Sequence, residues 1–275
     1  MRRFTQVDVF GDGPGTGNPV AVVHDADGLG DDELQRFANW TNLSETTFLL
    51  PPTRDDADYR VRIFTPALEL PFAGHPTLGS AHAWLAASGT PDRQRVVQEC
   101  AAGLIEIRRR GGRLAFAAPP LRRSGPLDDQ TLADVVTTLA IDRAEIVDHA
   151  WTDNGPGWAS VRLRDAERVL ALTPRAGPAP DVGVVGLHPD GTPEVRAFVT
   201  DGHAWEDPVT GSLNAGLAEW LLDAGVLSAP YVAHQGTALG RRGRVHVDRD
   251  PGGTIWVGGD THTMIAGTVE LAGGE

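Results

Sequence analysis

The sequence predicts an α+β protein built from two similar halves. Three observations lead to this class: short segments in which apolar and polar residues alternate, two long helical segments that each begin near a glycine, and a repeat around those two segments. The 275 residues suffice for one large or two medium domains. Hydrophobic residues make up 41% and charged residues 22% of the chain, which is typical of a globular protein.

The first half is predicted to be an antiparallel α+β unit. A glycine-rich turn, Gly11–Pro19, joins its first two strands. A short helix over Asp31–Asn39 begins with acidic residues, and a longer one over Pro76–Ser88 ends at Gly89. The predicted strands are Thr5–Phe10, Val20–Val23, Thr46–Leu50, Tyr59–Phe64, Arg95–Glu99, Leu104–Arg109 and Arg113–Ala117.

The segment Ala118–Leu127 is the predicted linker, because its prolines can continue neither a helix nor a central strand. We expect domains over 1–118 and 119–262, with the terminal segment 263–275 as a candidate to return to the first. A surface loop is predicted at Pro174–Asp181. The second half has predicted helices at Asp129–Leu139 and Leu213–Ala224, and predicted strands at Ala159–Leu163, Glu194–Val199, Arg244–Val247, Thr254–Val257 and Thr263–Leu271.

The chain contains an internal repeat. When Glu69–Ala87 is placed on Glu206–Ala224, an offset of 137, identical residues fall at 7 of 19 positions. Two glycine-initiated helices can resemble each other by chance, but duplication of a strand, turn and helix explains the match better. Each helix start offers free N–H groups and a partial positive charge. Two such starts facing one cleft predict a receptacle for a small carboxylate.

Composition excludes several function classes. Asp and Glu number 37 against 24 basic residues, a formal charge of −13, which disfavours nucleic acid and anionic membranes as partners. All 24 basic residues are arginine, so a lysine Schiff base, a pyridoxal anchor and a phosphate-loop lysine are excluded. The single cysteine, Cys100, can form neither an intrachain disulfide nor a CxxC site. Because no signal-peptide segment or long apolar run appears, we expect a cytoplasmic protein.

Three local motifs have more than one interpretation. Gly11–Gly17 resembles a nucleotide loop but precedes a strand, so a hairpin or Ω-type loop is favoured. His75 and His82 stand seven residues apart with no third ligand, so no metal site is expected. Thr210–Asn214 contains a serine, Ser212, but lacks the second glycine of a nucleophile elbow, which leaves a hydrolase as a weaker alternative.

Glu45 lies between a helix and a very apolar strand, in the segment Asn42–Leu50. A glutamate beside serine and threonine is most often a solvated cap. Its apolar surroundings favour the opposite interpretation, because burial raises the pKa of a carboxyl group toward neutrality, where the group can take up and return a proton.

At these residues the sequence resembles the PhzF family of phenazine-biosynthesis isomerases. The resemblance covers nearly the whole chain, and together its motifs are specific. It implies the diaminopimelate epimerase-like fold, in which two similar α+β domains each wrap a mostly antiparallel sheet around a central helix, with the active site between them. The motifs are Gln6–Phe10, Gly17–Val23, Asn42–Thr46, Phe64–Pro66, Gly74–Leu78, Glu206–Ser212, Gln235–Gly236 and Leu239–Arg241.

The resemblance also implies roles for individual residues. Glu45 would be the acid/base residue, and His75 and Asp207 would hold the substrate and assist catalysis. Further substrate-binding positions would be Ser212, Asn18 and the two helix-start glycines, Gly74 and Gly211. Related racemases carry a thiol pair just before those glycines, where this chain has Ala73 and Thr210, so a two-thiol racemase is excluded.

Two departures from the phenazine branch lie close to the expected pocket: Asn214 stands where a histidine is common, and Trp205 lies in the unfamiliar segment His203–Trp205. The resemblance implies an isomerase that acts on a small conjugated or cyclic amino or carboxylic acid and needs neither a cofactor nor a metal. It also implies a homodimer with a role in secondary metabolism. Because of the two departures, the substrate can differ from the phenazine precursor. The alternatives are a hydrolase with Ser212 as nucleophile and His75 as base, and a non-catalytic ligand-binding or scaffold protein.

Overall fold

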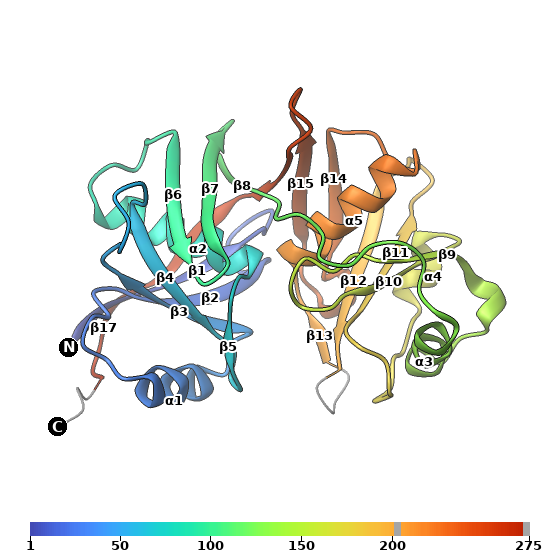
Figure 1. Cartoon of the computed structure of the whole chain (residues 1–275), viewed down its shortest axis with the longest axis horizontal. Helices are drawn as coiled ribbons and strands as arrows, with labels where there is room; N and C mark the ends of the chain where they lie inside the picture. The colour runs from blue at the N-terminus through green and yellow to red at the C-terminus, as the bar shows by residue number, and fades with distance from the viewer. Residues whose placement is uncertain (201–204, 272–275) are drawn as a thin grey trace. The chain divides into compact units, whose positions relative to one another are not determined.

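The computed structural model describes residues 1–200 and 205–271, which pack as two compact units. Unit 1 comprises Met1–Ala117 and the segment from Gly258 onward, and unit 2 comprises Ala118–Val257 (Figure 1). Each unit is of the α+β class, with a mostly antiparallel set of strands and few helices. The domain boundaries expected at 118/119 and 262/263 stay a prediction. No helix in the described part of the chain combines the length and apolarity needed to cross a bilayer.

Unit 1 alternates strands with two helices, α1 (Asp31–Thr41) and α2 (Gly74–Ala87). Its strands are β1 (Arg2–Val9), β2 (Asn18–Val23), β3 (Glu45–Leu50), β4 (Tyr59–Phe64), β5 (Glu69–Leu70), β6 (Arg95–Cys100), β7 (Gly103–Arg110), β8 (Arg113–Ala117) and β17 (Thr261–Val269). β1 lies between β2 and β17 and is antiparallel to both. The predicted hairpin at Gly11–Pro19 is confirmed by the β1–β2 pairing.

Unit 2 contains the helices α3 (Asp129–Leu139), α4 (Ala166–Leu170) and α5 (Gly211–Asp223). Two 3-10 turns lie at Arg143–Glu145 and Thr237–Leu239. Its strands are β9 (Ile146–Trp151), β10 (Ala159–Leu163), β11 (Val182–Leu187), β12 (Pro193–Val199), β13 (Trp205–Asp207), β14 (Tyr231–Gln235) and β15 (Gly243–Arg249). β16 (Ile255–Gly259) crosses from unit 2 into unit 1.

The two units share one pairing scheme. In unit 1 the parallel pairs are β2–β3 and β4–β6, and in unit 2 they are β10–β11 and β12–β14. The antiparallel pairs β1–β2, β3–β4, β4–β5 and β6–β7 correspond to β9–β10, β11–β12, β12–β13 and β14–β15. The helices α2 and α5 occupy the same place in this order. The duplication inferred from the sequence therefore extends beyond the aligned segments Glu69–Ala87 and Glu206–Ala224 to most strands of both units.

Each unit has one central helix that is buried on nearly all sides, as expected for a helix without a polar face. α2 contacts β1, β2, β3 and β8, and eight consecutive residues from its start are buried. The corresponding glycines Gly79 and Gly216 allow the close packing. A Cβ at Gly79 would lie 2.3 Å from Val20 Cγ1, and one at Gly216 would lie 2.2 Å from the Thr152 carbonyl oxygen.

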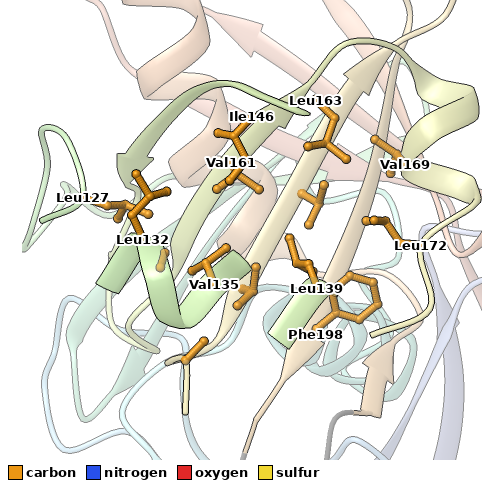
Figure 2. Close-up of a cluster of buried hydrophobic side chains, with 14 of the residues drawn as sticks. Leu127, Leu132, Val135, Leu139, Ile146, Val161, Leu163, Val169, Leu172 and Phe198 are labelled. Atoms are coloured by element: carbon orange, nitrogen blue, oxygen red, sulfur yellow. The ribbon is translucent and has the colours of Figure 1, made fainter. Parts of the chain in front are cut away.

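A second helix covers the outer face of each set of strands. In unit 1, Leu34 and Ala38 of α1 pack with Phe48 and Phe64, whose rings meet edge to face at 5.6 Å. In unit 2, α3 begins at an Asp128 cap and supplies a row of apolar side chains to the buried cluster around Phe198 that Figure 2 shows. These two apolar clusters pack the strands against α1 and α3, and neither cluster includes the first residues of α2 or α5.

The observed elements differ from the predicted ones mainly at their ends. Both central helices begin two residues earlier than predicted, at Gly74 and Gly211. The N–H groups of the first helical turn have no partner within the helix, so a glycine or Pro76 can stand there without preventing helix formation. The sequence analysis missed the short elements β5, α4 and β13 and the strands β9, β11 and β14. His203, which the sequence analysis singled out beside Trp205, lies outside the described residues.

Candidate active site

In unit 1 the structure brings Glu45 and His75 together. Glu45 is the first residue of β3, and His75 is the second residue of α2. Glu45 Oε2 lies 3.2 Å from His75 Nε2, with 14% of the Glu45 side chain and 3% of the His75 side chain exposed. The carboxyl group is therefore largely buried, with an imidazole beside it.

Burial sets the charge of His75. It lowers the pKa of the imidazole from 6.5 to about 3, an effect that a hydrogen bond with the Pro19 backbone partly offsets. At neutral pH the ring is uncharged, so its contact with Glu45 joins a neutral group to a carboxyl group and is not an ion pair. This imidazole therefore brings no positive charge to Glu45 at neutral pH.

A tight turn places Asn18 against the other side of the same ring. Asn18 Nδ2 lies 3.3 Å from His75 Nδ1. The preceding turn is held by the buried Asp8 carboxylate, which accepts hydrogen bonds from the Thr16 and Gly17 backbone N–H groups at 3.0 and 3.1 Å. The glycine-rich segment that resembles a nucleotide loop therefore binds the Asp8 carboxylate of the same chain. This binding fixes the position of Asn18.

Gly74 begins α2 beside these residues. The preceding residue, Ala73, is extended, and no side chain among the described residues caps the helix start. The third residue of the helix is Pro76, which has no N–H group, so the first-turn donors come from Gly74 and His75. Asn18, Glu45, Gly74 and His75 thus form one group in unit 1.

In unit 2 the predicted residue Asp207 ends β13 and faces the start of α5. Its Oδ2 accepts a hydrogen bond from Thr210 Oγ1 at 2.6 Å. Thr210 is the N-cap residue of α5, and its side chain makes no hydrogen bond to the helix backbone. The threonine hydroxyl therefore orients the carboxylate rather than capping the helix, and Gly211 begins the helix without a side-chain cap.

Gln235, the last residue of β14, fixes this turn. Its Oε1 accepts hydrogen bonds from Thr210 N at 3.0 Å and from Asn214 Nδ2 at 2.8 Å. Its Nε2 donates to Thr210 Oγ1 at 2.9 Å and to the Asp207 carbonyl at 3.2 Å. A fully buried amide thus holds Asp207, Thr210 and Asn214 together. The sequence motif contains Gln235 but did not indicate this role.

Ser212 is held by two residues that the sequence analysis did not single out. Its Oγ accepts a hydrogen bond from Trp158 Nε1 at 3.1 Å, and its carbonyl accepts one from Asn154 Nδ2 at 2.9 Å. Within its own unit, Ser212 Oγ is hydrogen-bonded to no histidine. Trp158 and Asn154 therefore fix the position of Ser212 at the start of α5.

The two units place equivalent residues around equivalent helix starts. The second residue of α2, His75, meets Asn18, and the second residue of α5, Ser212, meets Asn154. Asn18 and Asn154 are separated by 136 residues, which is one less than the offset of the repeat. The repeat offset of 137 therefore leads from Asn18 to Gly155, so a one-residue shift separates Asn154 from the position that the repeat predicts.

The remaining predicted positions lie as follows. Asn214 is buried on α5 and donates a second hydrogen bond from Nδ2 to the Thr210 carbonyl at 2.9 Å. Trp205 begins β13 and is exposed. Cys100 ends β6, where burial raises the pKa of its thiol. Ala73 and Thr210 are the N-cap residues of α2 and α5, the positions at which the resemblance places the thiols of related racemases.

Comparison with known proteins covers nearly the whole chain. The sequence profile of PhzC-PhzF, described as "Phenazine biosynthesis-like protein", matches residues 7–268. The trans-2,3-dihydro-3-hydroxyanthranilate isomerase of Pseudomonas aeruginosa is 32% identical over 273 residues, which are 92% of each chain. "Antisense-enhancing sequence 1" of Schizosaccharomyces pombe is 36% identical over 96% of this chain and 97% of its own. A solved structure, a predicted epimerase from Pseudomonas aeruginosa, superposes with a TM-score of 0.80 at 27% identity over 99% of this chain and 100% of its own.

Proposed function

Because the chain belongs to the PhzC-PhzF family of phenazine biosynthesis-like proteins, we propose that it is an isomerase without a cofactor that moves a proton, and with it a double bond, within a small conjugated or cyclic amino or carboxylic acid. The 32% identity to trans-2,3-dihydro-3-hydroxyanthranilate isomerase supports this reaction class. The observation that carries the proposal is the sheltered Glu45 carboxyl group, 3.2 Å from the neutral imidazole of His75.

Glu45 is the proposed acid and base. As a carboxylate it removes a proton from an sp3 carbon next to a diene or imine, and the electron pair of the broken C–H bond enters the conjugated system. The carboxylic acid that forms then returns the proton to another carbon of that system. One residue serves both steps, so the substrate changes its isomeric form while the protein ends in its starting state.

The two helix starts are the proposed carboxylate receptors. Gly74 and Gly211 each begin a buried helix that has no side-chain cap, and such helix starts favour anions. In this proposal the amino or hydroxyl groups of the substrate are held by four side chains, those of His75, Asn18, Asp207 and Ser212.

The test compares Glu45→Gln with Glu219→Gln in deuterium oxide, using candidate conjugated amino and carboxylic acids. The wild type is expected to place deuterium on the carbon that receives the proton. Glu45→Gln should bind the substrate and turn over about 100- to 10,000-fold more slowly, because a positioned general base contributes about that much. Glu219→Gln removes another partly buried carboxyl group, whose pKa is raised by burial, and should keep wild-type turnover. Wild-type turnover by Glu45→Gln would refute the role of Glu45.

In the hydrolase alternative, Ser212 is the nucleophile and not a substrate-binding residue. A nucleophilic serine would be labelled by a fluorophosphonate, and Ser212→Ala would abolish turnover. In the isomerase proposal Ser212→Ala weakens substrate binding, the probe does not react, and deuterium incorporation continues. The contact from Trp158 to Ser212 Oγ supports a binding role, because that indole donates a hydrogen bond and cannot remove a proton.

A non-catalytic member would bind such acids without incorporating deuterium. The side chains expected for catalysis are all present in the sequence, which supports an active enzyme. The substrate, a role in secondary metabolism, a cytoplasmic location and a homodimer belong to the same proposal. Asn214 and Trp205 are its proposed determinants of substrate choice.

A further inference from the structure

Three side chains outside the candidate active site converge at one end of β12. They are His188, directly after β11, Glu194, the second residue of β12, and His234 in β14. Glu194 pairs in register with His234 on one side and with Gly186 on the other. Because His188 follows Gly186 by two residues, the three side chains share one face of the sheet.

The atoms of this cluster are already close. His188 Nε2 lies 3.0 Å and His234 Nδ1 lies 4.0 Å from Glu194 Oε2, and the three potential ligand atoms all lie within 4.8 Å of one another. Ligand atoms around a tetrahedral zinc ion are separated by about 3.3 Å. The set would reach that spacing only if His234, whose side chain is 30% exposed, moved its ring closer to Glu194.

Glu194 is buried and, among the described residues, has one carboxyl oxygen without a hydrogen bond. Its side chain is 1% exposed, and Oε1 has no hydrogen-bond partner in the parts of the chain that are described. Arg196, on the same face of β12, is already bound to Glu206 and to backbone carbonyls. A divalent cation bound at the Glu194 carboxyl group would offset the cost of burying that group.

The strand pair of unit 1 that corresponds to β12 and β14 carries different charged residues. There Arg60 of β4 pairs in register with Glu99 of β6, which sets a permanent positive charge opposite a negative one. In unit 2, Glu194 of β12 pairs with His234 of β14. The duplicated strand pair has thus exchanged an arginine and a carboxylate for a carboxylate and a histidine, which is a combination of ligand types that bind metal ions.

We propose that His188, Glu194 and His234 bind a divalent transition-metal ion, with Zn²⁺ as the best match to two imidazole nitrogens and one carboxylate oxygen. Water would complete the coordination. The side chains of His188 and His234 are 29% and 30% exposed, so the ion can enter from solvent. Its effect would be structural, since it joins β11, β12 and β14 and stabilises the folded state that binds it.

The test is a zinc titration of the full chain in competition with a chromophoric chelator, followed by thermal unfolding with and without Zn²⁺. The wild type is expected to bind one ion and to unfold at higher temperature when zinc is present. His188→Gln and His234→Gln should each weaken zinc binding about tenfold or more and lose the thermal shift. His262→Gln, which removes a partly exposed histidine of unit 1, is the matched control and should behave as wild type.

Two results would overturn the proposal: no saturable zinc binding by the wild type, or binding that His188→Gln and His234→Gln leave unchanged. Glu194→Gln keeps the shape of the side chain and removes its charge, so it should bind zinc weakly while remaining folded without metal. If that variant does not fold, the two histidine variants still decide, because their side chains are partly exposed. Proton-transfer activity plays no part in the readout, so this proposal and the isomerase proposal can fail separately.

Discussion

Arg196 holds Glu206 by two parallel hydrogen bonds, from Nε to Oε1 at 3.1 Å and from Nη2 to Oε2 at 2.6 Å, directly before Asp207. Unit 1 repeats this pair with Arg62 and Glu69, at 2.7 and 2.6 Å. Each guanidinium also lies over a phenylalanine two residues further along its strand, at 4.8 Å in unit 2 and 5.1 Å in unit 1. The duplicated unit therefore carries its own clamp between the strand and the turn that leads to the central helix.

The two clamps should differ in their contribution to stability. The side chains of Arg196 and Glu206 are 6% and 7% exposed, whereas those of Arg62 and Glu69 are 24% and 36% exposed. Arg196→Met leaves a buried carboxylate unpaired and should lower the free energy of unfolding by about 3–5 kcal/mol. Arg62→Met should cost about 1 kcal/mol or less, because solvent screens the pair. Urea unfolding of both variants measures the difference, and equal losses would contradict the role of burial.

Stability should depend on pH through His75. Its pKa is about 3 in the folded protein and 6.5 in the unfolded chain, so below pH 6.5 only the unfolded chain takes up the proton. The contribution of His75 is complete above pH 6.5 and is lost as the pH falls toward 3, at about 1.4 kcal/mol per pH unit. Between pH 6.5 and pH 5 we expect a loss of about 2 kcal/mol.

This loss can be isolated by difference. Urea unfolding of wild type and His75→Gln at a series of pH values should give stabilities that converge as the pH falls, since the variant has no imidazole to protonate. Parallel curves for wild type and His75→Gln would show that this imidazole is not held neutral by the fold.

Gly216 should not tolerate a side chain. An added Cβ would meet the Thr152 carbonyl oxygen at 2.2 Å, and a backbone atom cannot rotate away. Gly216→Ala should therefore destabilise the protein by about 1–3 kcal/mol, although alanine is the better helix former. Gly267→Ala is the control, since nothing lies within 4 Å of its added Cβ. Thermal unfolding measures both, and a stabilised Gly216→Ala would refute the close approach of α5 to the Thr152 backbone.

Asn214 should be sensitive to the loss of its donor. Its Nδ2 donates to Thr210 O at 2.9 Å and to Gln235 Oε1 at 2.8 Å. Asn214→Asp places a carboxylate oxygen against these two acceptors and should cost about 3 kcal/mol or more at neutral pH. The deficit should shrink in acid, where the aspartic acid regains one donor.

The exposed Asn39 is the control for this exchange. It donates from Nδ2 to the Pro66 carbonyl at 3.0 Å near the surface, so solvent can replace its hydrogen bond. Asn39→Asp should cost less than about 1 kcal/mol by urea unfolding. A similar cost for the two exchanges would show that burial of Asn214 does not matter.

Regular elements with strong local signals could be predicted from the sequence. The bounds of β4, β8, α3 and β10 match the predicted ranges, because alternation or an Asp128 cap marks them. The strand β11 was missed because both of its faces are buried and it contains Gly183 and Gly186, so it has no alternation. β5 and β13 consist of two and three residues, which is too short for any periodic signal.

Some residues of the candidate site could likewise be predicted from the sequence, and others could not. Glu45, His75, Asp207 and Ser212 lie in motifs that the sequence displays, so their identity could be predicted. Asn154 and Gln235 act through contacts with residues 58 and 25 positions away, and local spacing does not reveal such contacts. The cluster of His188, Glu194 and His234 was missed for the same reason, since the pairing of β12 with β14 brings its third member into place.

The strand β17 affects the order in which the chain can fold during synthesis. It pairs with β1 from Val9–Thr261 to Arg2–Val269, so β1 gains its second neighbour only when residues near 269 have been made. Unit 2 is complete once Val257 has been made. Unit 1 is therefore completed after unit 2, and until then β1 has an unpaired hydrogen-bonding edge, which is the kind of edge at which chains aggregate.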